Sequence, residues 1–257
     1  MAKLVEALGR SLISFTRELG GITALLGQAC RKIFVPPFDA RIMVAQLIAV
    51  GIRSFPVVLI TAIFTGMVLA LQTYTGFKRF GAEALVGTVV ALSMTREMGP
   101  VLTALIVAGR AGAAMAAELG TMRVTEQIDA LETLATDPVK YLVVPRFVAG
   151  VVMLPALAVL TDIIGILGGY LITVGLFDVS ATIYWNRTWD YLEATDIYYG
   201  LVKACFFGAF ISIISCYRGY YAEGGAEGVG RATTGAVVLS SMSILIGDYF
   251  LSAWLFG

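Results

Sequence analysis

The sequence contains no histidine among its 257 residues, and only 14% of the residues are charged. A Ser-His-Asp triad, an HExxH zinc site and a histidine-ligated haem all need an imidazole, which argues against each of these chemistries. No GxxxxGK[ST] loop is present, so the chain does not bind ATP by that route. Cys30, Cys205 and Cys216 are scattered without CxxC spacing and are interpreted as packing residues. We therefore predict no catalytic residue, no metal site and no cofactor bound by this chain.

Apolar residues are abundant instead. They make up 58% of the chain, and the mean hydropathy is +0.86, which is too apolar for a soluble domain. Several runs approach the roughly 20 residues that cross a bilayer. We predict one all-α membrane domain over residues 1–257, with no nucleic-acid partner because the net charge is zero. The five expected spans are 47–74, 84–111, 147–174, 198–217 and 232–256.

Residues 1–34 have the pattern of an amphipathic helix or two, ended by Pro36-Pro37. Basic residues step by seven along the opposite face, at Lys3, Arg10 and Arg17. This pattern predicts a helix in the membrane interface; the alternative is an ordinary helix packed on a soluble core. The apolar stripe consists of Leu4, Leu8, Leu12, Phe15, Leu19, Ile22 and Leu26.

The second span carries an ionisable pair, Arg96 and Glu97, shortly before Gly99-Pro100, a pair expected to perturb the helix. A charge within an apolar span costs a few kcal/mol on insertion scales, so this face should look into protein or water. Adjacent helical residues point about 100° apart, so the two side chains cannot face the same way. The charged residues in other spans that are available as partners for this pair are Asp162, Lys203 and Asp248. The pattern fits a patch for a charged or zwitterionic head group and equally fits a structural ion-pair network.

Two further patterns follow the charged pair. Ala108, Gly112, Ala116 and Gly120 repeat every four residues, which favours close packing of two helices unless it is chance in an alanine-rich stretch. Segment 123–137 is too short and too charged to cross a membrane, so we expect it to lie on the membrane surface. It is interpreted as a helix that docks on a peripheral partner, or else as a plain connection. Its predicted apolar face is Val124, Ile128, Leu131 and Leu134, and its predicted acidic face is Glu126, Asp129 and Glu132.

Two polar segments separate the last three spans. Residues 177–196 contain Trp185, Trp189 and Tyr191 and predict an interfacial helix. The glycine-rich stretch 218–235 has irregular glycine spacing and no preceding strand, so it is interpreted as a connection rather than a phosphate-binding loop. With the N-terminus inside, twelve Lys and Arg residues fall in inner segments and three in outer segments. Segment 123–137 is therefore predicted to be cytoplasmic and segment 177–196 periplasmic, with the C-terminus periplasmic.

Three stretches resemble the MlaE (YrbE) family of permeases: residues 66–74 (GMVLALQTY), the long block 91–147 beginning ALSMTREMGP, and residues 230–238 (GRATTGAVV). The resemblance implies the permease subunit of an ABC transporter that moves phospholipids between the inner and outer membranes of a Gram-negative envelope and so maintains lipid asymmetry. It implies a homodimer in the inner membrane, with a lipid cavity. It also implies three partners: a cytoplasmic MlaF-like ATPase that binds ATP and Mg, an MlaB-like STAS-domain protein, and a periplasmic MlaD-like hexamer of MCE domains.

The resemblance also implies roles for individual residues. Arg96, Glu97 and Lys203 would lie beside the lipid cavity, and Gln72 and Tyr74 near its mouth. The residues matching the coupling helix, which would engage the ATPase, are Glu126, Asp129, Leu131, Glu132 and Leu134.

Rival functions stay open on the residues alone. A secondary carrier would use Glu97, Asp162 and Asp248 as a proton relay and would transport by itself. A passive scaffold for a lipid-binding ring would tolerate alanine at Arg96 and Glu97. An intramembrane hydrolase with a Ser-Lys dyad is the least favoured hypothesis.

Overall fold

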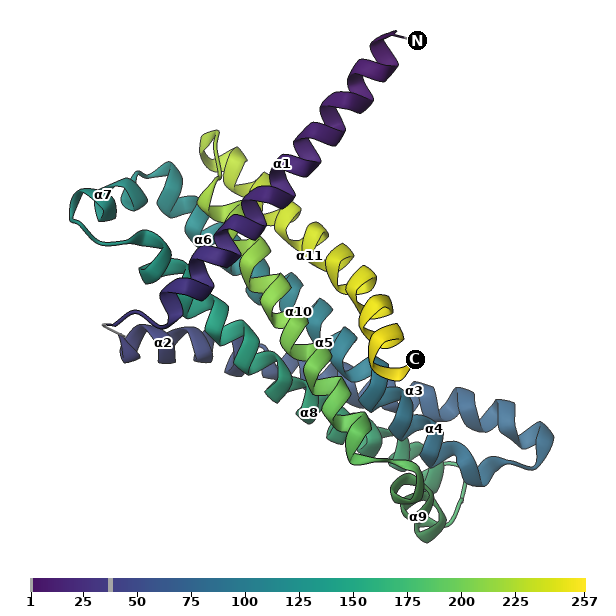
Figure 1. The fold of residues 1–257 in the computed structure, drawn as a ribbon. Coiled ribbons are helices and arrows are strands. Elements are labelled where there is room, and N and C mark those ends of the chain that lie inside the picture. The colour runs from purple at the N-terminus through teal and green to yellow at the C-terminus, as the bar shows by residue number, and fades with distance from the viewer. Residues whose placement is uncertain (1, 37–38) are drawn as a thin grey trace.

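Residues 2–36 and 39–257 are described by a computed structural model, and within these ranges the chain is helical and contains no β-strand (Figure 1). The α-helices are α1 Ala2–Ile33, α2 Ala40–Leu47, α3 Phe55–Phe77, α4 Val86–Ser93, α5 Gly99–Val107, α6 Ala113–Val124, α7 Gln127–Thr133, α8 Val144–Gly175, α9 Ala181–Tyr191, α10 Ala194–Tyr220 and α11 Gly225–Phe256. The long helices α8, α10 and α11 run side by side along an elongated bundle, and α1 crosses it (Figure 1).

Within the described residues, five continuous helical stretches are long and apolar enough to cross a membrane. Each predicted span lies inside one of them, so the predicted all-α membrane fold is confirmed. The stretches are longer than predicted because polar residues at the span ends stay helical, which keeps their backbone groups hydrogen-bonded within the helix. They are Ala40–Phe80, Glu83–Val124, Val139–Gly175, Ala194–Tyr220 and Gly225–Phe256.

The prediction that residues 218–235 form a glycine-rich connection is wrong. α10 continues to Tyr220, and α11 begins at Gly225. The turn between them depends on Gly224, whose φ of 93° suits a residue without a Cβ. Gly228 is then helical, and a Cβ there would overlap the Glu223 carbonyl. The glycines therefore permit a tight helix-to-helix turn rather than a loop.

α3 and α8 pack backbone to backbone. The buried face of α3 carries Ala62, Gly66 and Ala70, four residues apart. A Cβ on Gly66 would overlap the carbonyl of Gly165, and one on Gly168 would overlap the carbonyl of Ile63. Small residues at this spacing allow two helices to approach closely in a membrane.

The predicted small-residue stripe of the second span also packs closely. Ala108 and Ala116 are fully buried, and a Cβ on Gly112 would lie 2.9 Å from Ser215 Oγ. On α10, a Cβ at Gly219 would lie 2.7 Å from the Ala116 carbonyl oxygen. The stripe therefore joins the second span to α10 within one chain.

α1 is a single helix whose start projects from the bundle (Figure 1). Its second half packs on the bundle, because Ile22, Leu25 and Ala29 are buried in a cluster with Leu119 and Ile128. Of the predicted apolar stripe, Ile22 is buried and Leu19 is 42% exposed. The side chains of Lys3, Leu4, Leu8, Arg10, Leu12 and Phe15 lie outside the described residues.

Candidate functional site

The helix changes geometry where it carries the charged pair. Met94–Met98 form one π-helical turn between α4 and α5, and the Gly99 amide donates to the carbonyl of Met94, five residues before it. Pro100 has no N–H for the carbonyl of Arg96, four residues before it. The Lys203 ammonium donates to that carbonyl instead, at 2.9 Å. The predicted perturbation at Gly99-Pro100 is therefore a π turn within a continuous helix.

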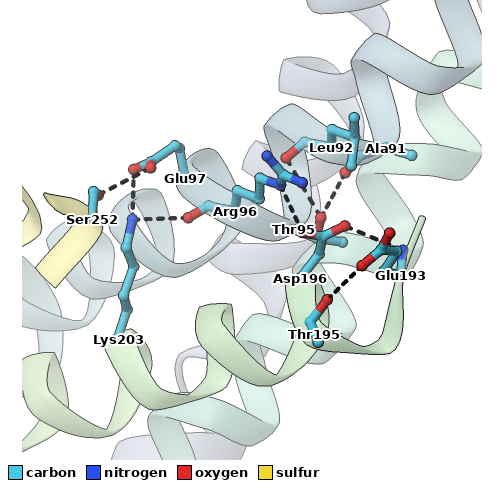
Figure 2. A network of polar contacts seen from close by, with 10 residues as sticks. All are labelled: Ala91, Leu92, Thr95, Arg96, Glu97, Glu193, Thr195, Asp196, Lys203 and Ser252. Atoms are coloured by element: carbon cyan, nitrogen blue, oxygen red, sulfur yellow. Dashed lines mark hydrogen bonds and ion pairs between the residues drawn. The ribbon is translucent and has the colours of Figure 1, made fainter. Parts of the chain in front are cut away.

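The side chains of Arg96 and Glu97 diverge, as the prediction from helix geometry requires. Arg96 Nε donates to Asp196 Oδ1 at 2.7 Å, in the first turn of α10. Glu97 Oε2 accepts from Lys203 Nζ at 2.8 Å, and its Oε1 accepts from Ser252 Oγ at 3.0 Å (Figure 2). The pair thus joins the second span to both α10 and α11.

Lys203 is the centre of this network. Its side chain has no exposed surface, yet its ammonium lies 2.8 Å from Glu97 and 3.0 Å from Asp248. A buried ammonium is stable only when it is paired and hydrogen-bonded, and here it has two carboxylates and one carbonyl. We define the polar centre as Arg96, Glu97, Asp196, Lys203 and Asp248.

The polar centre has a buried side and an open side. Lys203 and Asp196 are 0% and 3% exposed, whereas Arg96 and Glu97 are 41% and 44% exposed. The buried partners therefore fix the orientation of an open guanidinium and an open carboxylate. Such an arrangement offers one positive and one negative group to a ligand, which suits a zwitterion.

An aromatic ring partly covers the centre. Phe256, at the end of α11, lies 5.1 Å from the Arg96 guanidinium carbon and 5.6 Å from Lys203 Nζ, measured to the ring centroid. Tyr199 packs edge-on against the same ring at 5.2 Å. The cation–π contacts place the last turn of α11 against both cations of the centre.

Asp162 does not join the polar centre, although the sequence offers it as a partner. It is 8% exposed on α8, and its Oδ1 has no hydrogen-bond partner among the described residues. It lies against Gly99, where a Cβ would overlap Oδ1. The three carboxyl groups of the hypothetical proton relay are therefore not gathered: Glu97 and Asp248 share Lys203, and Asp162 stands apart.

An apolar groove of about 380 Å³ runs along α3 and reaches Met98, the residue after Glu97. Gln72 lines this groove. Tyr74 does not, because residues two apart on a helix point to nearly opposite sides. Its ring is 9% exposed and stacks on Phe177, with centroids 3.8 Å apart. The other lining residues are Ile60, Thr61, Phe64, Thr65, Val68 and Leu69.

The second group of predicted site residues lies at the other end of the bundle, on and around α7. The helix is shorter than the predicted segment 123–137, since Val124 ends α6 and Glu126 has a φ of 60°. Ile128 is buried and Leu131 packs on the same cluster. Leu134 departs from the predicted apolar face: it follows the last helical residue and is 74% exposed.

The acidic residues predicted on α7 are exposed. Asp129 lies 2.5 Å from Arg123, and Glu132 accepts a 3.4 Å hydrogen bond from the Tyr220 hydroxyl. Glu126 has no hydrogen bond from its side chain to the start of the helix. These groups and Leu134 form an open surface beyond the span ends.

The segment after α7 is attached to the end of α1. Lys32 Nζ lies 2.5 Å from Asp137, and Lys140 Nζ donates to the Pro36 carbonyl at 2.8 Å. Partial burial raises the pKa of Asp137, but hydrogen bonds from Lys32 and from the amides of Lys140 and Val139 outweigh it, so the pKa is below 3.8. The two contacts link the α7 surface to α1.

Two residues in or beside the polar centre, Asp196 and Ser252, were not predicted from the sequence. Asp196 belongs to a capping box with Glu193 at the start of α10, a spacing that is readable in the sequence. Ser252 lies one turn after Asp248 and one turn before Phe256, so the three share a face of α11. Within the described part of the chain, no three His, Cys, Asp or Glu side chains gather as metal ligands do.

A comparison with known families decides what kind of protein carries this site. The model of the family described as Permease MlaE matches residues 43–254. The chain belongs to the MlaE permease family. It is therefore a multi-pass membrane protein of the permease class, as the sequence resemblance predicted.

Relatives extend over the whole chain. A probable ABC transporter permease protein of Rickettsia felis is 51% identical over 256 residues, covering 100% of this chain and 99% of the relative. The intermembrane phospholipid transport system permease protein MlaE of Haemophilus influenzae is 39% identical, covering 100% of this chain and 99% of its own length. The chloroplastic protein Trigalactosyldiacylglycerol 1 of Arabidopsis thaliana is 39% identical, covering 91% of this chain and 67% of its own length.

Proposed function

We propose that this chain is the permease subunit of an ABC transporter that moves phospholipids between the inner and outer membranes of a bacterial envelope. One observation carries the proposal: the apolar groove on α3 includes Met98, the residue that follows the partly exposed Arg96 and Glu97 of the polar centre. An acyl chain fits the groove, while a phosphate can meet Arg96 and a head-group cation Glu97. The name of the Haemophilus influenzae relative points to the same class of substrate.

In the proposed assembly two copies of the chain enclose the lipid cavity in the inner membrane. The α7 surface is cytoplasmic and contacts an ATPase that binds ATP and Mg, accompanied by a STAS-domain protein. The end that carries α9 is periplasmic and faces a hexameric MCE-domain ring. Closure of the two ATPases would bring the second spans together and drive lipid between cavity and ring, which maintains lipid asymmetry of the outer membrane.

The groove is tested by filling it. Val68 lines the groove and is 52% exposed, while Val57 lies on the same helix outside the groove and is 49% exposed. Val68→Trp should lower the phospholipid that copurifies with the protein several-fold and slow lipid transfer by the reconstituted complex. Val57→Trp is the matched control and should leave both unchanged. Equal lipid content and equal transfer in the two variants would contradict the proposed cavity.

The ATPase contact is tested at Leu134, which is 74% exposed beside α7. Leu134→Ser should reduce copurification of the ATPase about fivefold, because truncating an apolar anchor at the centre of an interface can cost about 1 kcal/mol. Phe80→Ser is the control, since Phe80 is 83% exposed at the opposite end of the bundle. Combined substitution of Glu126, Asp129 and Glu132 should uncouple ATP hydrolysis from lipid movement. Unchanged coupling in both α7 variants would exclude this surface as the contact.

The secondary carrier is distinguished by its energy source. It predicts proton-driven lipid transport by the purified chain alone, whereas the ABC transporter predicts transport only with the ATPase and ATP. The separation of Asp162 from Glu97 and Asp248 gives the carrier no connected relay within the described residues.

A further inference from the structure

A second cleft, of about 430 Å³, lies at the end of the bundle that carries α7. α1, the end of α10 and the start of α11 form its walls. Arg218 in this cleft is fifteen residues beyond Lys203 on α10, roughly 22 Å along the helix. The cleft is thus separate from the polar centre and from the proposed transport path.

Arg218 lines the cleft and pairs with a residue of α1. Its Nη2 lies 2.5 Å from Glu18 Oε1 on α1, and its guanidinium group passes close to Gly235 on α11. Its Nε is buried and has no hydrogen-bond partner among the described residues. A guanidinium group carries five N–H donors, so one carboxylate leaves most of them free for another acceptor.

Two further cations line the same cleft. Arg17 is exposed, and no ion pair involves it among the described side chains. Arg231 pairs with Glu227 at 2.6 Å, but both are exposed, at 65% and 82%, so solvent screens this pair. Besides Glu18, the cleft holds one more carboxylate, Glu223. The residues that line the cleft therefore comprise three arginines and two glutamates, one net positive charge, with Glu227 outside the lining.

Neutral donors reinforce the cations. The first amides of α11 have no acceptor within the helix, and the helix begins at the edge of the cleft with a partial positive charge. Tyr217 and Tyr221 line the wall opposite, with ring centroids 4.9 Å apart. Tyrosines gather where a span meets the head groups, which places the cleft at head-group depth.

We propose that this cleft binds the phosphate group of an anionic phospholipid in the leaflet on the α7 side of the membrane. The volume is within the range of small-ligand sites, and basic pockets between membrane helices bind anionic head groups. Because Arg17 belongs to α1 and Arg231 to α11, the bound head group joins the two helices. The lipid is thus an anchor for α1, and the proposal holds whether or not the chain transports lipids.

The test uses the full-length protein in detergent and short-chain lipids added from solution. Binding of dihexanoyl phosphatidylglycerol, dihexanoyl phosphatidylcholine and inorganic phosphate is measured by calorimetry. We expect phosphatidylglycerol to bind at least tenfold more tightly than either other ligand. The double variant R17Q/R231Q should lose at least tenfold of that affinity, and it should keep the thermal midpoint of the lipid-free protein. R53Q removes an exposed arginine outside the cleft and should bind as the wild type does.

Three results would overturn the assignment. Unchanged phosphatidylglycerol binding in R17Q/R231Q, with R218Q also unchanged, would exclude the cleft as the site. Inorganic phosphate binding as tightly as phosphatidylglycerol would assign the cleft to free anions rather than lipid. Loss of phosphatidylglycerol binding when the same protein is purified with its ATPase would mean that an acidic protein surface occupies the cleft.

Discussion

Replacing Lys203 by methionine should destabilise the protein by leaving Glu97 and Asp248 without their shared cation. Removing one partner of a buried ion pair typically costs about 3–5 kcal/mol. Glu97 is 44% exposed and therefore partly solvated, so we expect the lower end, about 3 kcal/mol. A loss of 1 kcal/mol in unfolding free energy lowers the thermal unfolding midpoint by about 2–4 °C in a protein of this size, so this midpoint should fall by roughly 6–12 °C.

A compensating variant separates lost charge balance from lost packing. In K203M/E97Q/D248N the cation and both carboxylates are replaced by neutral groups of similar size, which is close to neutral for buried ion pairs. The triple variant should recover most of the midpoint lost by K203M. The 3 tryptophans and 11 tyrosines provide the fluorescence signal for thermal unfolding at one fixed heating rate.

Two results would refute this reasoning. If K203M unfolds at the wild-type temperature, the ammonium group does not neutralise the two carboxylates. If the triple variant is as unstable as K203M, the loss comes from packing around the lysine stem rather than from unpaired charge.

Two further predictions concern helix packing and pH. Gly66→Val should destabilise the protein by about 3 kcal/mol, because the new side chain meets the backbone of Gly165 rather than a movable side chain. The control is Gly76→Ala, on the same helix with open space around it. The measurement is the fraction of protein that stays folded after heating. The pKa of Asp137 is lowered below 3.8, so its contribution to stability is present above pH 3.8 and is lost as the pH falls through the folded-state value. The difference in thermal unfolding midpoint between wild type and D137N should therefore be largest near pH 6 and should shrink as the pH falls below about 3.8. A constant difference over this pH range would show that Asp137 acts without its charge.

Much of the fold follows from runs of apolar residues, because a helix is the only structure a single chain segment can adopt in lipid without unpaired backbone groups. The wrong prediction, a loop over 218–235, arose because local composition favours a loop where the folded chain forms a helix. Residues 225–230 are rich in glycine, which predicts a loop, yet they begin α11 because Gly224 supplies the left-handed turn. The length of each helix beyond its apolar span could not be predicted either, since it depends on how the polar residues at the helix ends pack.

The site was predictable where charge stands out. Arg96, Glu97, Lys203 and Asp248 are conspicuous inside apolar runs, and they do gather at one place. Asp196 lies in a polar segment, where one more carboxylate carries no signal. Tyr74 was predicted to lie near the cavity mouth, but the direction of its side chain could not be predicted. The ring stacks on Phe177, which follows the end of α8 and is distant in sequence.

The position of Phe256 bears on how the protein is best produced. Its ring rests on the two cations of the polar centre, and Gly257 follows it directly. A bulky group introduced at this end of α11 would disturb the polar centre without substitution of any of its charged residues. A group introduced near the start of α1 avoids this, because that part of the helix lies well clear of the bundle (Figure 1).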